Sequence, residues 1–152
     1  MDEKEIKILI FGVAGEYYAT DIRDVERILG FEKTTPMPDA PRFIEGVINY
    51  EDEILPIVNL EKKFKLKETN NAEAKKIISI KREEKKFGIV VEDVYEVRDA
   101  NTDSFENPPT IAIKSAQKYI KGLIKLDGKI IILLSLTDLL TEEEEEIIFS
   151  EK

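Results

Sequence analysis

Apolar and polar residues alternate in short runs along most of the chain, which is the period-two pattern of β-strands. The alternation predicts four hairpins, with paired strands at 7–13 and 16–20, 44–50 and 53–59, 76–82 and 86–92, and 120–126 and 129–134. Asp127-Gly128, between the last two strands, favours a type I′ turn because both central residues of that turn need positive φ. The pattern therefore indicates an all-β protein.

The four hairpins form two copies of one plan. A first shift, which lays Lys7 on Lys76, superimposes the first hairpin and the residues after it on the third. A second shift, which lays Gly46 on Gly122 and Ile54 on Ile130, superimposes the second hairpin on the fourth. Two strand-rich halves can share alternation by chance, but matched blocks in the same order favour an internal duplication. The pseudo-twofold halves are predicted to span about 6–68 and 75–140.

The remaining segments are predicted as short helices, loops and a terminal cap. Helices are expected at 21–29, 60–65 and 136–141, and breaker-rich loops at 34–41, 67–74 and 99–118. Thr141 and Glu144 have capping-box spacing, which predicts a last helix over 142–149 within a terminal cap at 141–152. The five consecutive glutamates at 142–146 follow Thr141 and suit the positive end of a helix dipole. They are therefore interpreted as the solvated start of this helix, and a metal site formed by Glu142, Glu145 and Glu146 is the less favoured alternative.

Composition removes most kinds of catalysis. The 152 residues include no His and no Cys, which excludes imidazole chemistry, thiolate nucleophiles, disulfides and ordinary zinc sites. No glycine-rich phosphate loop is present, and adjacent acids such as Glu92-Asp93 point to opposite faces of a strand. The sequence therefore predicts a protein that binds other molecules, with no enzymatic activity, cofactor or metal.

The net charge of the chain argues against nucleic acids and anionic membranes as binding partners. Lys and Arg number 23 and Asp and Glu 32, giving a net charge of −9 that repels nucleic acid and anionic membrane surfaces. The N-terminal segment carries acids, and no apolar run is long enough to span a bilayer, which predicts a cytoplasmic protein without direct membrane insertion. A protein-binding module is favoured, and a small-barrel nucleic-acid-binding module is the alternative.

Several segments resemble the CheW-like family of bacterial chemotaxis coupling proteins. Ile8 to Ile28 is similar to the family's opening, and Pro38 to Asn49 resembles its Pro-x-x-Pro-x-Phe-Ile-x-Gly-Val-x-Asn segment. Matches at Ile54–Leu60, Gly88–Val94 and Tyr119–Leu123 extend the resemblance over nearly the whole chain. The resemblance implies one domain over 1–152, folded as two intertwined five-stranded SH3-like β-barrels with short helices and a C-terminal helix.

The resemblance also implies a function and two sites. Members of the family are non-catalytic adaptors that join the cytoplasmic tip of a membrane chemoreceptor to the regulatory domain of a CheA-type histidine kinase, in arrays at the membrane. The receptor would bind at the seam between the barrels, at the positions that match Ile22, Val25, Arg27, Ile28 and Glu51. The kinase would bind the strand-turn region formed by Asn49, Tyr50, Glu51, Asp52 and Glu53.

This chain departs from the family pattern at two places. The family usually has Asn-Leu-Arg-Gly where this chain has Asn49-Tyr50-Glu51-Asp52, and an acid where Arg27 stands. Asp52 strains the backbone by about 1–2 kcal/mol if the turn still needs positive φ there. The double charge reversal predicts that Arg27 and Glu51 face each other as an ion pair. Two unrelated surface changes are the alternative in a chain with 36% charged residues.

Overall fold

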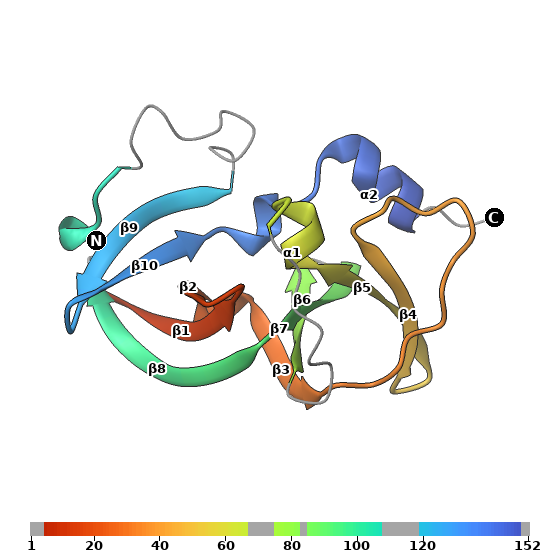
Figure 1. Ribbon diagram of the computed structural model, residues 1–152, viewed down its shortest axis with the longest axis horizontal. Helices are drawn as coiled ribbons and strands as arrows, with labels where there is room; N and C mark the ends of the chain where they lie inside the picture. Colours follow the sequence, from red (N-terminus) through yellow and green to blue (C-terminus); the bar gives the residue numbers. More distant parts are fainter. Residues whose placement is uncertain (1–4, 67–74, 83–84, 108–118, 150–152) are drawn as a thin grey trace.

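The computed structural model describes residues 5–66, 75–82, 85–107 and 119–149, whose strands form two curved, mixed five-stranded sheets (Figure 1). Sheet A has the strand order β8-β1-β2-β10-β9, and sheet B has the order β3-β6-β7-β5-β4. The strands are β1 Glu5–Val13, β2 Glu16–Asp21, β3 Val25–Gly30, β4 Ile44–Tyr50, β5 Glu53–Asn59, β6 Lys76–Arg82, β7 Lys85–Val91, β8 Asp93–Asn101, β9 Ile120–Leu126 and β10 Lys129–Leu134.

Each sheet takes strands from both halves of the chain. Sheet A joins β1 and β2 to β8, β9 and β10, and sheet B joins β6 and β7 to β3, β4 and β5. The parallel pairings β2–β10 and β5–β7 connect the halves, with Leu133 opposite Ala19 and Ile57 opposite Gly88. The first sequence shift lays Ala19 on Gly88, and the second lays Ile57 on Leu133, so the two parallel pairings are equivalent. Neither half therefore forms a sheet by itself.

The duplication extends to the irregularities of the strands. Bulges occur at Glu26 on β3 and at Tyr95 on β8, which the first shift superimposes. Two further bulges occur at Glu45 on β4 and Lys121 on β9, which the second shift superimposes. Because a bulge bends its strand and increases the local twist, matched bulges give the two sheets matching curvature.

A crossover segment approaches the outer edge of each sheet. Thr35 makes two backbone hydrogen bonds of 2.9 Å with Val47 on β4, and Glu106 pairs in the same way with Leu123 on β9. These are isolated bridges, and the strand pairings of the described residues do not close either sheet into the expected barrel. The segment beside β4 contains three prolines, which have no N–H to extend a ladder of hydrogen bonds.

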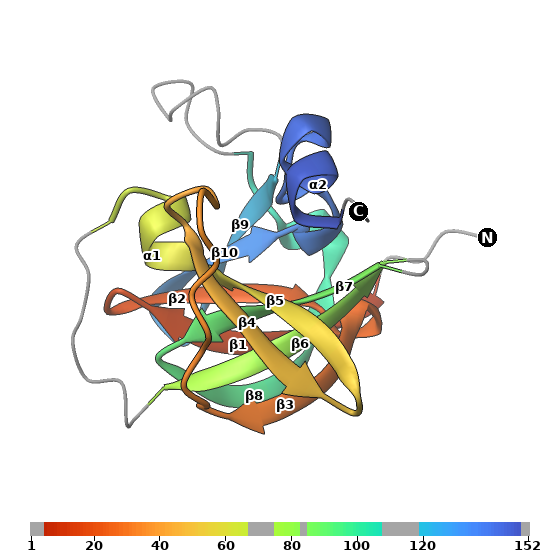
Figure 2. The same cartoon turned by 90° about the vertical axis from the view of Figure 1, so that its right-hand side faces the viewer.

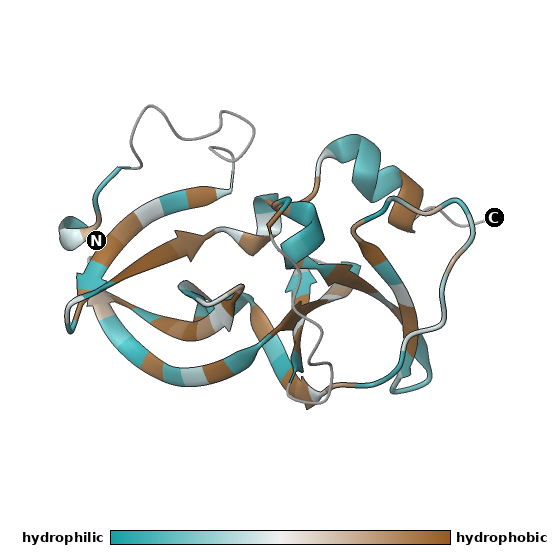
Figure 3. Ribbon diagram, in the orientation of Figure 1, coloured by the Kyte–Doolittle hydropathy of each residue, from teal (hydrophilic) through white to brown (hydrophobic). Residues whose placement is uncertain are grey.

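Three clusters of buried side chains form the core. The largest lies between the sheets and contains Phe11, Tyr18, Ile80, Phe87 and Leu134. The other two lie within the curve of each sheet, around Ile10 and Ile131 in sheet A and around Ile57 and Ile77 in sheet B. Figure 3 shows apolar and polar residues alternating along the outer strands β8 and β9, whereas β10 is apolar along nearly its whole length. Successive residues of β1 and β10 enter different clusters, so both faces of these inner strands are buried.

The helix predicted over 21–29 is wrong. Asp21 caps only one 3-10 turn, η1 (Ile22–Asp24), and the chain then continues as the edge strand β3. Ile22, Val25 and Leu29 have helical spacing, but pairing with β6 satisfies the backbone of β3 and overrides that local preference. The loop predicted over 99–118 is also wrong at its start, because β8 continues to Asn101 and a 3-10 turn, η3, follows at Thr102–Ser104.

The other predicted helices are short. α1 spans Leu60–Lys63, a 3-10 turn (η5) covers Leu136–Asp138, and α2 spans Glu142–Phe149. The predicted capping box is confirmed: the Glu144 amide donates to Thr141 Oγ1 at 3.0 Å, and the Thr141 amide donates to Glu144 Oε1 at 2.9 Å. The predicted loop 67–74, residues 108–118 and residues 150–152 lie outside the described residues.

The described residues include neither a helix that could span a membrane nor a cluster of acidic side chains that could bind a metal ion. None of their helices is long and apolar enough to cross a bilayer. The same residues contain no group of three or more acidic side chains placed to hold a metal ion.

The β4–β5 turn carries the backbone strain expected of its sequence. Glu51 and Asp52 have φ of 52° and 65°, while the equivalent turn of β9–β10 has φ of 53° at Asp127 and 78° at Gly128. We expect Asp52→Gly to raise the free energy of unfolding by about 0.5–1 kcal/mol, because relief of strain exceeds the added entropy of the unfolded chain. Urea denaturation measures this change. The reciprocal Gly128→Asp should lower stability, and a stability unchanged by both substitutions would contradict the interpretation.

Candidate partner-binding surfaces

Four of the five residues predicted to form the receptor seam lie along η1 and β3, where the two sheets meet (Figure 1), and the fifth, Glu51, lies in the β4–β5 turn. Ile22 and Val25 are half-buried and pack against the central core cluster, which contains side chains of both sheets. Arg27 and Ile28 are exposed on β3. The structure therefore places two of the predicted residues within the boundary between the sheets and two on the adjoining surface.

The Asp21 carboxylate caps the turn that leads into β3. Asp21 Oδ1 accepts a hydrogen bond from the Arg23 amide at 2.9 Å, and the Arg23 guanidinium lies 2.7 Å from Asp21 Oδ2. The hydrogen bond from the Arg23 side chain is the main cause of the lowered pKa of Asp21. Burial, with a contribution from the Asp21 carboxylate, raises the pKa of Asp24. The entrance to β3 is therefore held by a charged side-chain cap.

Arg27 and Glu51 form the predicted ion pair. Arg27 Nη1 lies 3.2 Å from Glu51 Oε2, with side chains 60% and 49% exposed. β3 and β4 are the two end strands of sheet B, so the pair spans the open side of the curved sheet. An ion pair this exposed contributes only about 0–1 kcal/mol to folding stability. The pair joins the β4–β5 turn to β3.

A second set of ionic contacts, not predicted from the sequence, also links β3 to the β4–β5 hairpin. Lys86 Nζ on β7 lies 3.1 Å from Glu26 Oε2 and 3.7 Å from Glu53 Oε1, and Ser79 Oγ donates to Glu26 Oε1 at 2.9 Å. Burial acts to raise the pKa of Glu26, but the hydrogen bonds from Ser79 and Lys86 outweigh it, and the pKa is lowered. Lys86 thus connects the bulge of β3 with the β4–β5 hairpin.

The strand-turn region predicted to bind the kinase is mostly exposed. Asn49, Glu51, Asp52 and Glu53 face solvent, whereas Tyr50 is buried in the core of sheet B and is therefore a supporting residue. The neighbouring Ile54 is 74% exposed. The hairpin tip presents one apolar side chain beside three carboxylates.

Sheet A carries a related surface at the equivalent place. Asp127, which the second shift lays on Glu51, pairs with Arg98 on β8 at 2.9 Å. Ile130, the equivalent of Ile54, is 58% exposed, and Val97, the equivalent of Ile28, is also exposed. Applying the two sequence shifts to the predicted site would have located this second surface.

The two surfaces differ in chemistry. The positions of Glu26, Lys86 and Glu53 in sheet B are occupied in sheet A by Tyr95, Tyr17 and Lys129. The rings of Tyr17 and Tyr95 lie 5.5 Å apart, and Lys129 Nζ lies 4.7 Å from the Tyr17 ring centroid. These side chains line a cavity of about 180 Å³. One hairpin tip is therefore rich in carboxylates and the other in aromatic and cationic groups.

Comparison with known proteins identifies the family of the chain. Residues 7–144 match the family described as the CheW-like domain. The chain is 32% identical over 138 residues to the chemotaxis protein CheW of Klebsiella aerogenes, covering 91% of this chain and 83% of that protein. It is 26% identical to the CheW of Treponema pallidum, covering 95% and 87%. The crystal structure of the scaffolding protein TtCheW from Thermoanaerobacter tengcongensis superimposes with a TM-score of 0.84 at 32% identity, covering 97% of this chain and 95% of that one.

Proposed function

Because the chain belongs to the CheW-like family of non-catalytic chemotaxis scaffold proteins that couple receptors to the kinase CheA, we propose a division of its surface between two partners. The seam formed by Ile22, Val25, Arg27, Ile28 and Glu51 binds the cytoplasmic tip of a chemoreceptor. The β4–β5 hairpin tip binds the regulatory domain of the CheA-type histidine kinase. Binding to both partners recruits the protein to receptor arrays at the membrane.

The geometry of β3 is the observation that carries the receptor assignment. Val25 at its start and Ile22 in the preceding turn reach the boundary between the sheets, while Ile28 remains exposed beside them. A receptor tip is helical, and a helix that lays an apolar stripe along a groove is a recurring mode of recognition. The crossover bridges beside β4 and β9 support the family's SH3-like barrels as the finer description of each curved sheet.

The hairpin tip supports the kinase assignment through Ile54. A branched side chain that is 74% exposed next to an acidic turn is suited to a partner with an apolar pocket and a basic rim. Glu51, Asp52 and Glu53 would accelerate encounter with such a rim. Arg27 and Lys86 hold this tip against β3, so the two binding surfaces are mechanically connected.

Titration with the purified regulatory domain of a CheA-type kinase tests the proposal. We expect Ile54→Glu to weaken binding at least about tenfold, because the substitution places a charge in the apolar contact. Ile130→Glu is the matched control at the equivalent position of sheet A and should have little effect. A loss with Ile130→Glu instead would move the kinase to sheet A. No binding of the wild-type chain to the kinase or to a receptor signalling fragment would overturn the function.

A further inference from the structure

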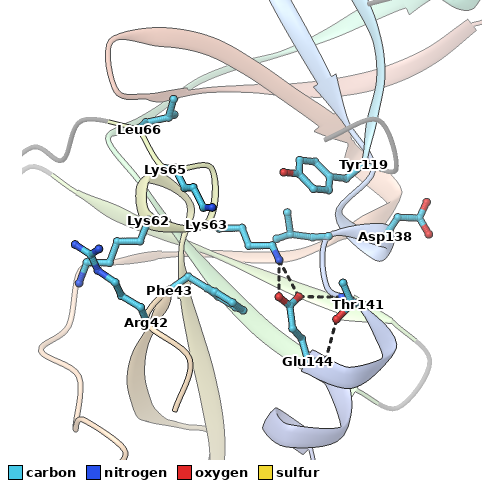
Figure 4. A pocket seen from close by; sticks show the side chains of 11 residues that line it. Arg42, Phe43, Lys62, Lys63, Lys65, Leu66, Tyr119, Asp138, Thr141 and Glu144 are labelled. Carbon is cyan, nitrogen blue, oxygen red and sulfur yellow. Dashed lines mark hydrogen bonds and ion pairs between the residues drawn. The ribbon is translucent and has the colours of Figure 1, made fainter. Parts of the chain in front are cut away.

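A pocket lies between α1, α2 and the start of β9 (Figure 4). These three elements lie on the side of the molecule opposite β3 (Figures 1 and 2). Its volume is about 720 Å³, within the range of sites that bind ligands or peptide side chains. Phe43, Leu66, Tyr119 and Leu139 supply apolar surface. This pocket is separate from both surfaces assigned above.

The pocket walls are held by packing. The Tyr119 ring stacks on Phe64 with centroids 5.2 Å apart, and Phe64 stacks on the buried Tyr18 at 5.9 Å. On the other side, Lys63 Nζ lies 4.5 Å from the Phe43 ring centroid. Because these rings connect to the central core cluster, the shape of the pocket exists before any partner arrives.

The charge of the pocket is opposite to that of the whole protein. The chain has a net charge of −9, yet the lining contains four cations and two carboxylates. The cations are Arg42, Lys62, Lys63 and Lys65, and the carboxylates are Asp138 and Glu144. A cationic concavity in an acidic protein indicates an anionic occupant.

One carboxylate already occupies part of this surface. Lys63 Nζ donates to both carboxylate oxygens of Glu144, at 2.7 and 2.9 Å, as Figure 4 shows. The capping box at Thr141 fixes the same carboxylate from behind. The contact demonstrates that the pocket accommodates a glutamate side chain next to an aromatic ring.

Other ionic contacts leave a cation without a counter-ion. Lys62 pairs with Glu45 at 3.2 Å, and Asp138 pairs with Lys121 at 3.4 Å. Lys65 is exposed at the end of α1 with φ of 60°, and none of the described carboxylates lies within ion-pair distance of its ammonium group. Lys65 is therefore available to an incoming carboxylate.

Tyr119 adds a neutral donor. Burial raises its pKa, and the nearby Glu144 carboxylate adds to the effect, so the hydroxyl keeps its proton at neutral pH. The ring provides apolar surface while the hydroxyl can donate a hydrogen bond to a carboxylate.

We propose that this pocket binds an acidic peptide segment of a partner protein, in which glutamates flank an aromatic or branched apolar residue. The apolar side chain packs between Phe43 and Tyr119, and a flanking carboxylate pairs with Lys65. The site lies away from the seam and the β4–β5 tip, so it can be occupied while the receptor and the kinase are bound.

The test uses a fluorescein-labelled Glu-Glu-Phe-Glu-Glu peptide, measured by anisotropy in about 0.1 M salt to screen long-range repulsion. We expect saturable binding that Lys65→Glu weakens about tenfold. Lys125→Glu makes the same charge change about 20 Å along β9 from Tyr119 and should alter affinity less than twofold. A peptide with Ser in place of Phe should also bind about tenfold more weakly.

Amide chemical shifts locate the bound peptide, and the expected changes lie at residues 42–43, 62–66 and 119. Absence of binding at millimolar peptide, shift changes confined to other residues, or equal weakening by the two lysine variants would each overturn the proposal. Lys65→Glu should retain wild-type affinity for the kinase and the receptor, which separates this site from the scaffold function.

Discussion

Gly46→Ala should lower the free energy of unfolding by about 3 kcal/mol or more, because the new side chain has neither a favourable backbone conformation nor free space. Gly46 has φ of 142°, a conformation that L-residues rarely adopt, and an added Cβ would lie 2.3 Å from the Thr35 carbonyl oxygen. Thr35 cannot withdraw without breaking its two backbone hydrogen bonds to Val47. Thermal and urea unfolding measure the loss.

The duplicated glycine provides the matched control for this substitution. Gly122 occupies the equivalent place on β9, but its φ lies outside the left-handed region, and an added Cβ would have 3.2 Å to Phe105 Cβ and 3.3 Å to the Glu106 carbonyl oxygen. Gly122→Ala should therefore cost about 1 kcal/mol or less. Equal destabilisation by the two substitutions would show that close backbone approach is not the reason for Gly46.

Reversing one member of the Arg27–Glu51 pair should weaken receptor binding about tenfold, and reversing both should restore most of the affinity. Arg27→Glu or Glu51→Arg alone places like charges about 3 Å apart across the open side of sheet B, which separates the turn from β3. Folding stability should change by only about 1 kcal/mol, since both side chains are half-exposed. A double-mutant cycle on affinity for a receptor signalling fragment measures the coupling.

Sheet A again supplies the control. Exchanging the charges of Arg98 and Asp127 perturbs an ion pair between β8 and the β9–β10 turn, whose Asp127 is the equivalent of Glu51. The exchange should leave receptor affinity unchanged if the seam beside β3 is the receptor site. Additive effects of the two single reversals at positions 27 and 51 would show that the pair has no role in orienting the seam.

The chain sequence alone determined the local structure. Alternating apolar residues specified the paired hairpins, Asp127-Gly128 specified a turn with two positive φ angles, and Thr141 with Glu144 specified the start of α2. Each of these features depends on residues a few positions apart, so the pattern contains the required information. The paired charge reversal also predicted a long-range contact, Arg27 with Glu51, because two substitutions at once imply proximity.

Tertiary structure decided which strands share a sheet. The periodicity of Ile22, Val25 and Leu29 suits a helix, but these residues enter an edge strand and its preceding turn because β6 is available to pair with β3. Local pattern also cannot reveal that β2 pairs with β10 and β5 with β7, since parallel pairing joins segments that are far apart in the sequence.

Some residues of the candidate sites could be named from the sequence, whereas other contacts depend on the tertiary structure. Arg27, Glu51 and the exposed hairpin tip could be named from the sequence, whereas Lys86 joins Glu26 to Glu53 only after β7 lies between β6 and β5. The pocket between α1 and α2 likewise requires Lys63 and Glu144, which are 81 residues apart in the sequence, to meet beside Phe43. Short-range hydrogen bonding and alternation are encoded in neighbouring residues, but the meeting of distant charges depends on which strands and helices pack together in the folded chain.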